Sequence, residues 1–425
     1  VLCHSAAPGK WAQAVMDQGT RLLIYSHDSF GLGHLRRCRT IAHHLVGQFR
    51  QLSVLILSGS PIIGSFAFES RVDFVRVPGV IKLRDGEYVP QTLRLGIDQM
   101  LEMRRSIIHH TAAVFEPDVF LVDKEPVGLR GEVRSTLEML KARGTRCVLG
   151  LRDILDDAAV VRAQWQAADH LRVVTEAYDA VWVYGSPLIC DAAREYGFPQ
   201  RLTEKVHYLG YLDHRRRLEA TGPDLVPAVA AETVCCVGGG QDGMALARAF
   251  AAAELPSVER AALICGPFMP PAHRTALAQV VGQRSDMRLL DFLEEPLPLM
   301  ASARRIVAMG GYNTTVEILT LGKPGLIVPR IRPRREQLVR AERLQALHLV
   351  DLLHPDALDA AAISAWLASE PQPRSAARKI LDFQALDRLP HAAAQLVEGL
   401  DGKPVAPQAA ATAYEMYEMG VLRCA

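Results

Sequence analysis

The feature that most constrains the fold is a recurring unit, in which a short apolar run ends at a turn and is followed by residues with helical spacing. In the first half of the chain the apolar runs are Arg21–Ser26, Leu52–Leu57, Val72–Val77, Val119–Asp123, Arg146–Leu151 and Ala180–Tyr184. These runs do not alternate apolar and polar residues. They therefore predict strands of a parallel sheet that is buried on both faces.

A second series of the same kind occupies the other half. Its predicted strands are Thr233–Val237, Ala261–Cys265, Met287–Leu290, Arg305–Met309 and Gly325–Val328. The fold class expected from the two series is α/β, with two facing doubly wound Rossmann-like domains and a cleft between them. In sheets of this type, ligands bind beyond the carboxyl ends of the strands.

The series set the expected domain boundaries. Residues 1–20 are predicted to be an N-terminal extension, and 21–212 the first domain. An Arg-, Ala- and Pro-rich stretch over 213–232 is expected to be a linker. The second domain is predicted over 233–402, and a tail over 403–425.

Charge and hydropathy exclude several classes of protein. Lys plus Arg number 48 against 47 for Asp plus Glu, so no strong basic balance indicates a nucleic-acid partner. No apolar run approaches the roughly 20 residues of a transmembrane helix. None of the eight cysteines forms a Cys-x-x-Cys pair or a zinc-type cluster. We therefore expect a cytoplasmic protein that has no metal site, cofactor or nucleic-acid partner.

The turn Gly31-Leu-Gly-His34 follows the first predicted strand and opens a helix. A helix N-terminus disfavours a protonated imidazole, so His34 is a candidate neutral base. The alternative is that His34 only caps the helix or bonds a carbonyl. Asp28 could orient His34 or fill the turn. Asp123 and Asp153, at the ends of two later strands, are further acid/base candidates, although such carboxylates also form turns.

The stretch Gly31-Leu-Gly-His-Leu-Arg-Arg-Cys-Arg-Thr-Ile-Ala42 resembles the first-domain loop of GT-B nucleotide-sugar enzymes. It is especially similar to the Gly-x-Gly-His-x-x-Arg-Cys stretch of the nucleotide-sugar hydrolase of the pseudaminic acid pathway. That resemblance implies that His34 is a catalytic residue.

Two glycine turns in the second half are typical of phosphate-binding sites. Gly238-Gly-Gly-Gln-Asp-Gly243 lies between a strand and a helix, where free N–H groups suit a diphosphate. Asp242 beside an anion is unfavourable and is expected to cap the helix. The second turn, Met309-Gly-Gly-Tyr-Asn-Thr-Thr-Val-Glu317, places two hydroxyls at a helix start. Glu317 could accept from both ribose hydroxyls, or it could be the glutamate of a capping box.

Residues Thr233–Leu353 resemble the C-terminal domain of glycosyltransferase family 28, typified by the N-acetylglucosaminyltransferase that completes lipid II. The resemblance rests on Gly238–Gly243, Asp291-Phe-Leu293, Glu317 and Glu336-Gln337, in that order. It implies that Gly238–Gly243 contacts the phosphates and that Asp291–Leu293 borders the base. It also implies that Glu317 binds the ribose and that Glu336 and Gln337 bind the donor sugar. The nucleotide-sugar-binding residues expected on these grounds are Gly239, Gly240, Gln241, Phe292, Leu293, Gly311, Asn313, Thr314, Thr315, Glu317, Arg335, Glu336 and Gln337.

Four arginines crowd the loop Arg330–Arg335. One of these arginines could neutralise the charge of a leaving diphosphate, and Arg335 is the candidate that we name. A solvated basic loop, or peripheral contact with an acidic membrane surface, are the alternatives. No Asp-x-Asp motif occurs, so the sequence does not indicate a metal clamp on the diphosphate.

The resemblances imply an inverting, metal-independent glycosyltransferase that uses a nucleotide-diphosphate sugar, expected to be a UDP-sugar, and an unidentified hydroxyl acceptor. A hydrolase with water as nucleophile, and a non-catalytic nucleotide-sugar-binding protein, are the alternatives.

Overall fold

The structure is a computed structural model that describes residues 9–27, 32–82, 87–220, 231–370 and 377–398. It contains two compact units. The first comprises the described residues up to Tyr211, except Leu32 and Gly33, together with 384–398. Leu32 and Gly33 belong to the second unit. The second runs from Leu212 to Phe383.

The first unit is built on a seven-stranded parallel sheet with strand order β3-β2-β1-β6-β7-β8-β9. Its strands are β1 (Arg21–Ser26), β2 (Ser53–Ser58), β3 (Val72–Arg76), β6 (Val119–Asp123), β7 (Arg146–Arg152), β8 (Ala180–Tyr184) and β9 (Val206–Tyr208). Every residue of β6 and of β8 is buried. The continuous apolar runs of the sequence are therefore central strands covered on both faces.

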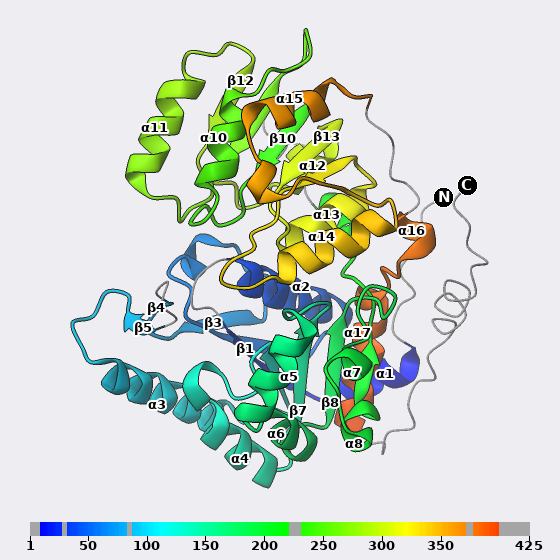
Figure 1. The fold of residues 1–425 in the computed structure, drawn as a ribbon. Coiled ribbons are helices and arrows are strands. Elements are labelled where there is room, and N and C mark those ends of the chain that lie inside the picture. Colours follow the sequence, from blue (N-terminus) through cyan, green and yellow to red (C-terminus); the bar gives the residue numbers. More distant parts are fainter. Residues whose placement is uncertain (1–8, 28–31, 83–86, 221–230, 371–376, 399–425) are drawn as a thin grey trace. The chain divides into compact units, whose positions relative to one another are not determined.

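The helices of this unit cover both faces of the sheet, with α3 and α4 on one side and α2 on the other (Figure 1). They are α1 (Lys10–Met16), α2 (Gly33–Gln48), α3 (Ile97–Phe115), α4 (Arg134–Ala142), α5 (Ala158–Ala167), α6 (His170–Ala177), α7 (Ala192–Glu195), α8 (Gln200–Thr203) and α17 (Ala385–Glu398). A short antiparallel hairpin, β4 (Val80–Lys82) and β5 (Tyr88–Pro90), lies apart from the main sheet.

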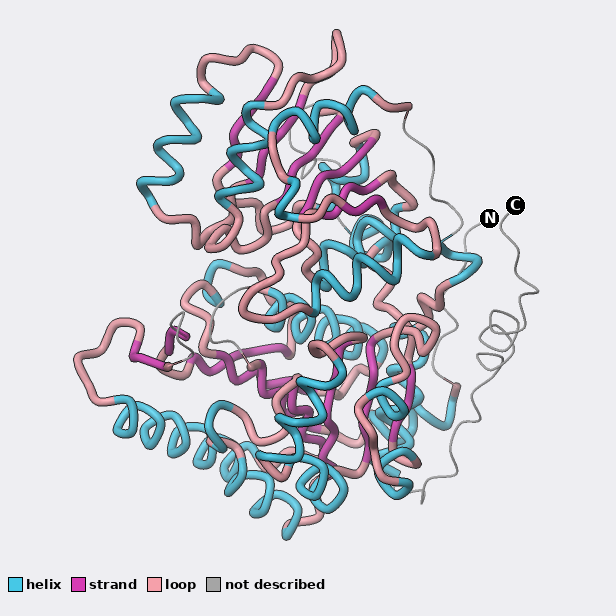
Figure 2. Tube along the Cα trace, viewed as in Figure 1, coloured by secondary structure: helices cyan, strands magenta, loops and turns pink. Residues whose placement is uncertain are grey.

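The second unit has a six-stranded parallel sheet with strand order β12-β11-β10-β13-β14-β15. Its strands are β10 (Thr233–Cys236), β11 (Ala261–Ile264), β12 (Met287–Leu290), β13 (Arg305–Ala308), β14 (Gly325–Ile327) and β15 (Asp351–Leu352). Its helices are α9 (Arg215–Ala220), α10 (Met244–Ala252), α11 (Pro271–Val281), α12 (Leu297–Ser302), α13 (Tyr312–Leu321), α14 (Glu336–Ala346), α15 (Ala360–Ala368) and α16 (Ala377–Ile380). Helices and strands alternate along the chain (Figure 2).

Both sheets have the doubly wound order, and the α/β prediction is confirmed. In each sheet the chain first adds strands on one side of the starting strand and then on the other. The direction changes between β1 and β6 in the first sheet, and between β10 and β13 in the second. Loops separate at these points beyond the carboxyl ends of the strands, which is where doubly wound proteins bind ligands.

The predicted boundaries need three corrections. Residues 10–16 of the predicted extension form helix α1, whose Ala12 and Met16 are buried. The predicted linker is not a separate segment, because 212–220 and 231–232 belong to the second unit, whereas 221–230 lie outside the described residues. The second unit ends at Phe383 rather than at 402, because α17 returns to the first unit. The predicted tail, 403–425, also lies outside the described residues.

Helix α17 belongs to the first unit because its apolar face packs there. It contacts α1, and the Trp11 indole N–H donates to Glu398. The Ala385 amide donates to the Tyr211 carbonyl at 3.3 Å, and the Arg388 guanidinium donates to the Leu209 carbonyl at 2.9 Å. An amphipathic pattern predicts a helix but does not identify the surface that the helix will cover.

No helix in the described part of the chain is long and apolar enough to cross a membrane. Six of the eight cysteines lie in that part, and all six are free and buried.

Candidate functional site

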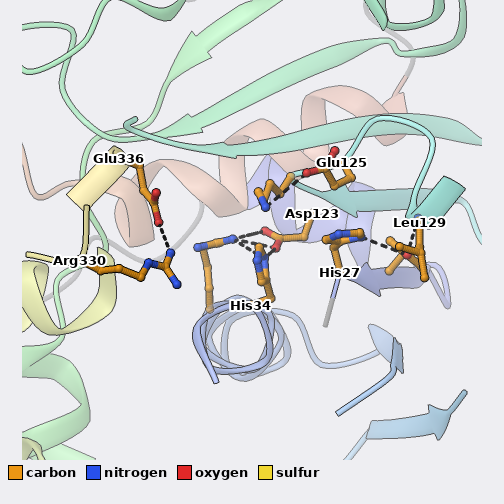
Figure 3. A network of polar contacts seen from close by, with 10 residues as sticks. His27, His34, Asp123, Glu125, Leu129, Arg330 and Glu336 are labelled. Atoms are coloured by element: carbon orange, nitrogen blue, oxygen red, sulfur yellow. Dashed lines mark hydrogen bonds and ion pairs between the residues drawn. The ribbon is translucent and has the colours of Figure 1, made fainter. Parts of the chain in front are cut away.

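The first candidate site lies where the first sheet changes direction. His34 is the second residue of α2, which follows β1, and Asp123 is the last residue of the neighbouring strand β6. The His34 Nδ1 contacts Asp123 Oδ2, and the contact is drawn in Figure 3. The structure thus brings together two of the three residues predicted to be catalytic.

Arg37, one turn after His34 on α2, completes this cluster. Its Nε donates to Asp123 Oδ1 at 2.9 Å, and its terminal nitrogen donates to both carboxylate oxygens, at 2.8 Å and 2.7 Å. Arg37 and Asp123 are almost wholly buried, at 2% and 1% exposure. A bidentate, charge-assisted contact of this kind fixes the orientation of the carboxylate.

The charges in the cluster set the proton positions. Burial alone would raise the pKa of Asp123, but Arg37 and His34 outweigh burial and hold that pKa well below its ordinary value. Burial lowers the pKa of His34 to about 4, although Asp123 opposes the shift. His34 is therefore neutral at physiological pH. Its Nδ1–H donates to the ionised carboxylate, which leaves Nε2 as the basic atom.

Asp153 has a different environment. It follows β7, one strand beyond β6, and its carboxylate accepts from the Tyr211 hydroxyl at 3.0 Å and from the Ile154 amide at 2.7 Å. These bonds hold the Asp153 carboxylate in place at the end of its strand. Asp28 lies outside the described residues.

The second candidate site lies where the second sheet changes direction. The loop after β10 carries Gly239, Gly240 and Gln241, and the loop after β13 carries Gly311 as the residue that precedes α13. Because β10 and β13 are neighbours, both predicted phosphate-side loops begin at the same edge of one sheet. Gln241 is exposed, whereas Gly239 and Gly311 are half-buried.

The glycine loop after β10 is tightly packed. Gly240 has φ +90°, and a Cβ there would lie 2.2 Å from the Cys265 carbonyl oxygen. The Phe268 amide donates to the Gly239 carbonyl at 2.8 Å. Packing against the loop after β11 therefore explains the glycine at 240 without any ligand. Asp242 does not cap α10 as expected; it pairs with Arg330 at 3.1 Å.

Helix α13 supplies the predicted ribose-side residues. Asn313, Thr315 and Glu317 are buried in its first two turns, and Thr314 is half-buried. The third helical position is Thr314, so Glu317 is too far along the helix to be the glutamate of a capping box. Among the described residues, the buried Thr315 Oγ1 has no hydrogen-bond partner.

Arg217, on α9, connects Glu317 to the predicted base-side loop. It lies 3.5 Å from Glu317 Oε1, and its Nε donates to Glu295 at 2.9 Å. Glu295 is in the loop after β12 that also carries Phe292 and Leu293, both half-buried. The structure therefore links this loop to Glu317 through a guanidinium that the sequence did not single out.

The pair Glu336 and Gln337 begins α14, and both side chains are buried. Glu336 accepts from Arg330 at 2.8 Å, which Figure 3 shows, and Gln337 Oε1 accepts from the Arg330 amide at 2.9 Å. Arg330 is thus part of this cluster, and Arg335 is exposed. Within the described ranges, no three His, Cys, Asp or Glu side chains gather as a metal-binding group.

Sequence reasoning did not name Arg37 or Arg217 as site residues, and within the loop Arg330–Arg335 it named Arg335 rather than Arg330. For Arg37 a signal existed, since residues three apart on a helix share a face, and His34 and Arg37 have that spacing. The carboxylate partners of Arg217 lie 78 and 100 residues away, and Asp242 lies 88 residues from Arg330, so no local pattern reveals these pairs.

Comparison with known proteins agrees with this architecture. No protein-family model matches the sequence. An uncharacterized glycosyltransferase of Methanosarcina acetivorans is 27% identical over 158 residues, which span 37% of this chain and 39% of that protein.

Solved structures match nearly the whole chain. The calicheamicin glycosyltransferase CalG4 has a TM-score of 0.56 and 19% identity, and the match covers 91% of this chain and all of that one. UGT2 of Phytolacca americana, complexed with UDP-2fluoro-glucose and pterostilbene, has a TM-score of 0.55 and 12% identity, with 94% and 99% covered. A putative UDP-N-acetylglucosamine 2-epimerase from Listeria monocytogenes has a TM-score of 0.57 and 12% identity, with 90% and 97% covered.

These identities show the fold alone, and the fold is GT-B. Transferases and a putative epimerase share it, so the reaction has to be argued from the residues of the site.

Proposed function

We propose that the chain is a glycosyltransferase of GT-B fold that moves a sugar from a nucleotide-diphosphate sugar, specifically a UDP-sugar, to an acceptor hydroxyl. The partial likeness to a glycosyltransferase of Methanosarcina acetivorans supports the reaction class. The fold shared with UGT2, whose structure contains UDP-2fluoro-glucose, supports the donor class.

The observation that carries the proposal is the neutral His34, held by Asp123 at the point where the first sheet changes direction. A general base must be unprotonated and must present a free lone pair to the proton that it takes. Nδ1–H is bound to Asp123, so Nε2 is the atom that meets this requirement. Arg37 fixes the carboxylate, which in turn fixes the tautomer and the orientation of the ring.

In the proposed reaction, His34 Nε2 takes the proton of the acceptor hydroxyl as its oxygen attacks the anomeric carbon. The bond from that carbon to the diphosphate oxygen breaks, and the nucleoside diphosphate leaves with the electron pair. A direct displacement of this kind inverts the anomeric configuration. Asp123 stabilises the imidazolium that forms, which is the role of the carboxylate in a catalytic His–Asp pair.

We assign the donor to the second unit. The amides of Gly239 and Gln241, on either side of Gly240, whose own amide donates to the Val237 carbonyl at 3.2 Å, would bind the diphosphate with Gly311, Asn313, Thr314 and Thr315 at the start of α13. Glu317 would accept from the ribose hydroxyls, with Arg217 offsetting its charge. Phe292 and Leu293 would border the base, and Glu336 and Gln337 the sugar.

The charge that develops on the leaving diphosphate needs a positive partner. The arginines of the loop Arg330–Arg335 could supply it without a metal ion. The same loop could instead rest on an anionic membrane surface from the cytoplasmic side, and a vesicle-binding assay would detect that contact.

The test is turnover with a panel of nucleotide-diphosphate sugars, each offered with and without a mixture of hydroxyl acceptors. We expect release of UDP that requires an acceptor, that persists in EDTA and that His34→Ala abolishes. Rapid release of free sugar without an acceptor would replace the transferase proposal with a hydrolase. If the protein binds the donor without turning it over, and His34→Ala does not change that binding, the protein is a non-catalytic nucleotide-sugar-binding protein.

A further inference from the structure

A second buried histidine lies beside His34 and has no role in the reaction proposed above. His27 follows β1 directly and is 7% exposed. The ring centroids of His27 and His34 are 5.9 Å apart, and the ring planes meet at 87°. Figure 3 shows the two rings next to each other, close to Asp123.

The contacts of His27 fix which of its nitrogens carries the proton. Its Nδ1 lies 3.3 Å from the hydroxyl oxygen of Tyr25, on the same strand. That hydroxyl has one hydrogen, and it donates this hydrogen to Glu132 at 2.5 Å. The Leu129 amide donates to the same hydroxyl oxygen at 3.3 Å. The Tyr25 oxygen has no second hydrogen to donate, so it can only accept a hydrogen bond from His27. His27 therefore carries its proton on Nδ1.

A buried ion pair holds this arrangement in place. Glu132 accepts from the Arg104 Nε and from its terminal nitrogen, both at 2.6 Å, and Glu132 is wholly buried. Because Glu132 forms a two-bond ion pair with Arg104, its carboxylate is a stronger acceptor for the Tyr25 hydrogen than the neutral His27 ring is. Burial also raises the pKa of Tyr25 well above its ordinary value, so the hydroxyl keeps its hydrogen.

The result is an imidazole with a bare Nε2. Burial lowers the pKa of His27 well below its ordinary value, so the ring is neutral at physiological pH. Within the described part of the chain, Nε2 of His27 has no hydrogen-bond partner. His27 and His34 are thus both anchored through Nδ1, one by a tyrosine hydroxyl and the other by a carboxylate, and both keep Nε2 for a ligand.

We propose that His27 binds the acceptor, accepting a hydrogen bond at Nε2 from a second hydroxyl beside the one that His34 deprotonates, so that the preferred acceptor is a vicinal diol. This inference rests on the proposed function. An acceptor with one hydroxyl satisfies His34 alone and leaves the other buried nitrogen unpaired, which costs binding energy. His34, whose imidazolium is stabilised by Asp123, takes the proton; His27, which faces a neutral hydroxyl, only orients the substrate.

The first test reads the tautomer directly. The protein, labelled with ¹⁵N-histidine, is observed by NMR at pH 7, and the His27 signals are assigned from their loss in His27→Gln. We expect a protonated Nδ1 and a bare Nε2. Tyr25→Phe should disturb this pattern, whereas Tyr196→Phe, which removes another buried hydroxyl of the same unit, should not. A proton on Nε2, or an imidazolium, would overturn the proposal whatever reaction the protein catalyses.

The second test measures acceptor preference. Wild type is offered matched acceptors, cyclohexanol with trans-1,2-cyclohexanediol and phenol with catechol, together with the UDP-sugar that it turns over. We expect kcat/KM to favour the diols at least tenfold. In His27→Ala this preference should vanish through a higher KM for the diol, with kcat within about threefold of wild type. His207→Ala, a partly buried histidine on β9, is the matched control and should retain the preference.

The outcomes separate the two proposals. Equal use of both acceptor types by wild type, or an unchanged preference in His27→Ala, would overturn the role of His27 while the transferase proposal stands. No turnover of any donor by wild type would overturn the transferase proposal and the acceptor role with it. The NMR result would still show which ring nitrogen of His27 carries the proton.

Discussion

His34 and Asp123 follow the two adjacent strands, β1 and β6, between which the first sheet changes direction, and their side chains are in contact. Loops leave these strands toward opposite sides, so side chains can approach there beyond the strand ends. His34 and Asp123 are 89 positions apart in the sequence, so the fold brings together two residues that no local pattern connects.

Replacing His34 with Ala should abolish turnover and leave nucleotide binding intact. Loss of a general base typically lowers the rate by about 10²- to 10⁴-fold. The measurement is kcat together with the shift in melting temperature produced by UDP. His207→Ala serves as control. A rate within threefold of wild type in His34→Ala would exclude this residue as the base.

The acid limb of the pH profile should report His34. Because the pKa of His34 is lowered to about 4, kcat/KM should be constant near neutrality and fall as the pH drops through that value. In Asp123→Asn the carboxylate that raises the pKa of His34 is gone, so the acid limb of the kcat/KM profile should move to still lower pH. The value of kcat should also fall. Samples held at low pH and assayed again at pH 7 control for unfolding. A limb centred near pH 6.5 would contradict the buried, neutral state.

Glu317→Gln should weaken UDP binding about tenfold, because hydrogen bonds to a charged acceptor contribute about 1.5–3 kcal/mol and the amide retains part of that. Isothermal titration calorimetry measures the change. Glu342→Gln, at an exposed position of α14, is the matched control and should bind as wild type does. Equal affinities in the two variants would remove Glu317 from the nucleotide site.

Glu132→Ala should lower the free energy of unfolding of the first unit by about 3–5 kcal/mol, since it leaves the buried Arg104 charge without its carboxylate. The double variant Arg104→Met with Glu132→Leu should recover much of this loss. Urea unfolding followed by tryptophan fluorescence provides the measurement. Glu176→Ala, which breaks an exposed pair with Arg172, should cost less than about 1 kcal/mol. Similar losses in the two single variants would argue against a buried pair.

Gly240→Ala should destabilise the second unit more than Gly238→Ala. Both glycines have positive φ, +90° and +65°, where an L side chain costs about 1–2 kcal/mol of backbone strain. Only at 240 does the added Cβ also meet backbone, the Cys265 carbonyl oxygen. Differential scanning calorimetry compares the two. Equal melting temperatures would show that the loops after β10 and β11 are not tightly packed.

Sequence patterns predicted the two sheets because their central strands are continuous apolar runs that only burial explains. The two-residue strand β15 and the β4–β5 hairpin carry no such run and were not predicted. His34 could be proposed from the sequence because glycines mark the turn before it. The ion pair of Arg104 and Glu132 was not, because an arginine on a helix is ordinarily solvated and its partner lies 28 positions away.

The return of α17 to the first unit has a practical consequence for dissecting the chain. A fragment that stops at Tyr211 would expose the apolar surface that Leu386 and Leu389 cover, together with Met16 of α1. Independent expression of the N-terminal sheet therefore calls for a fusion that carries residues 384–398 behind a short artificial loop. Two such polypeptides, one per sheet, would carry the proposed base His34 and the proposed nucleotide-binding residues on separate molecules.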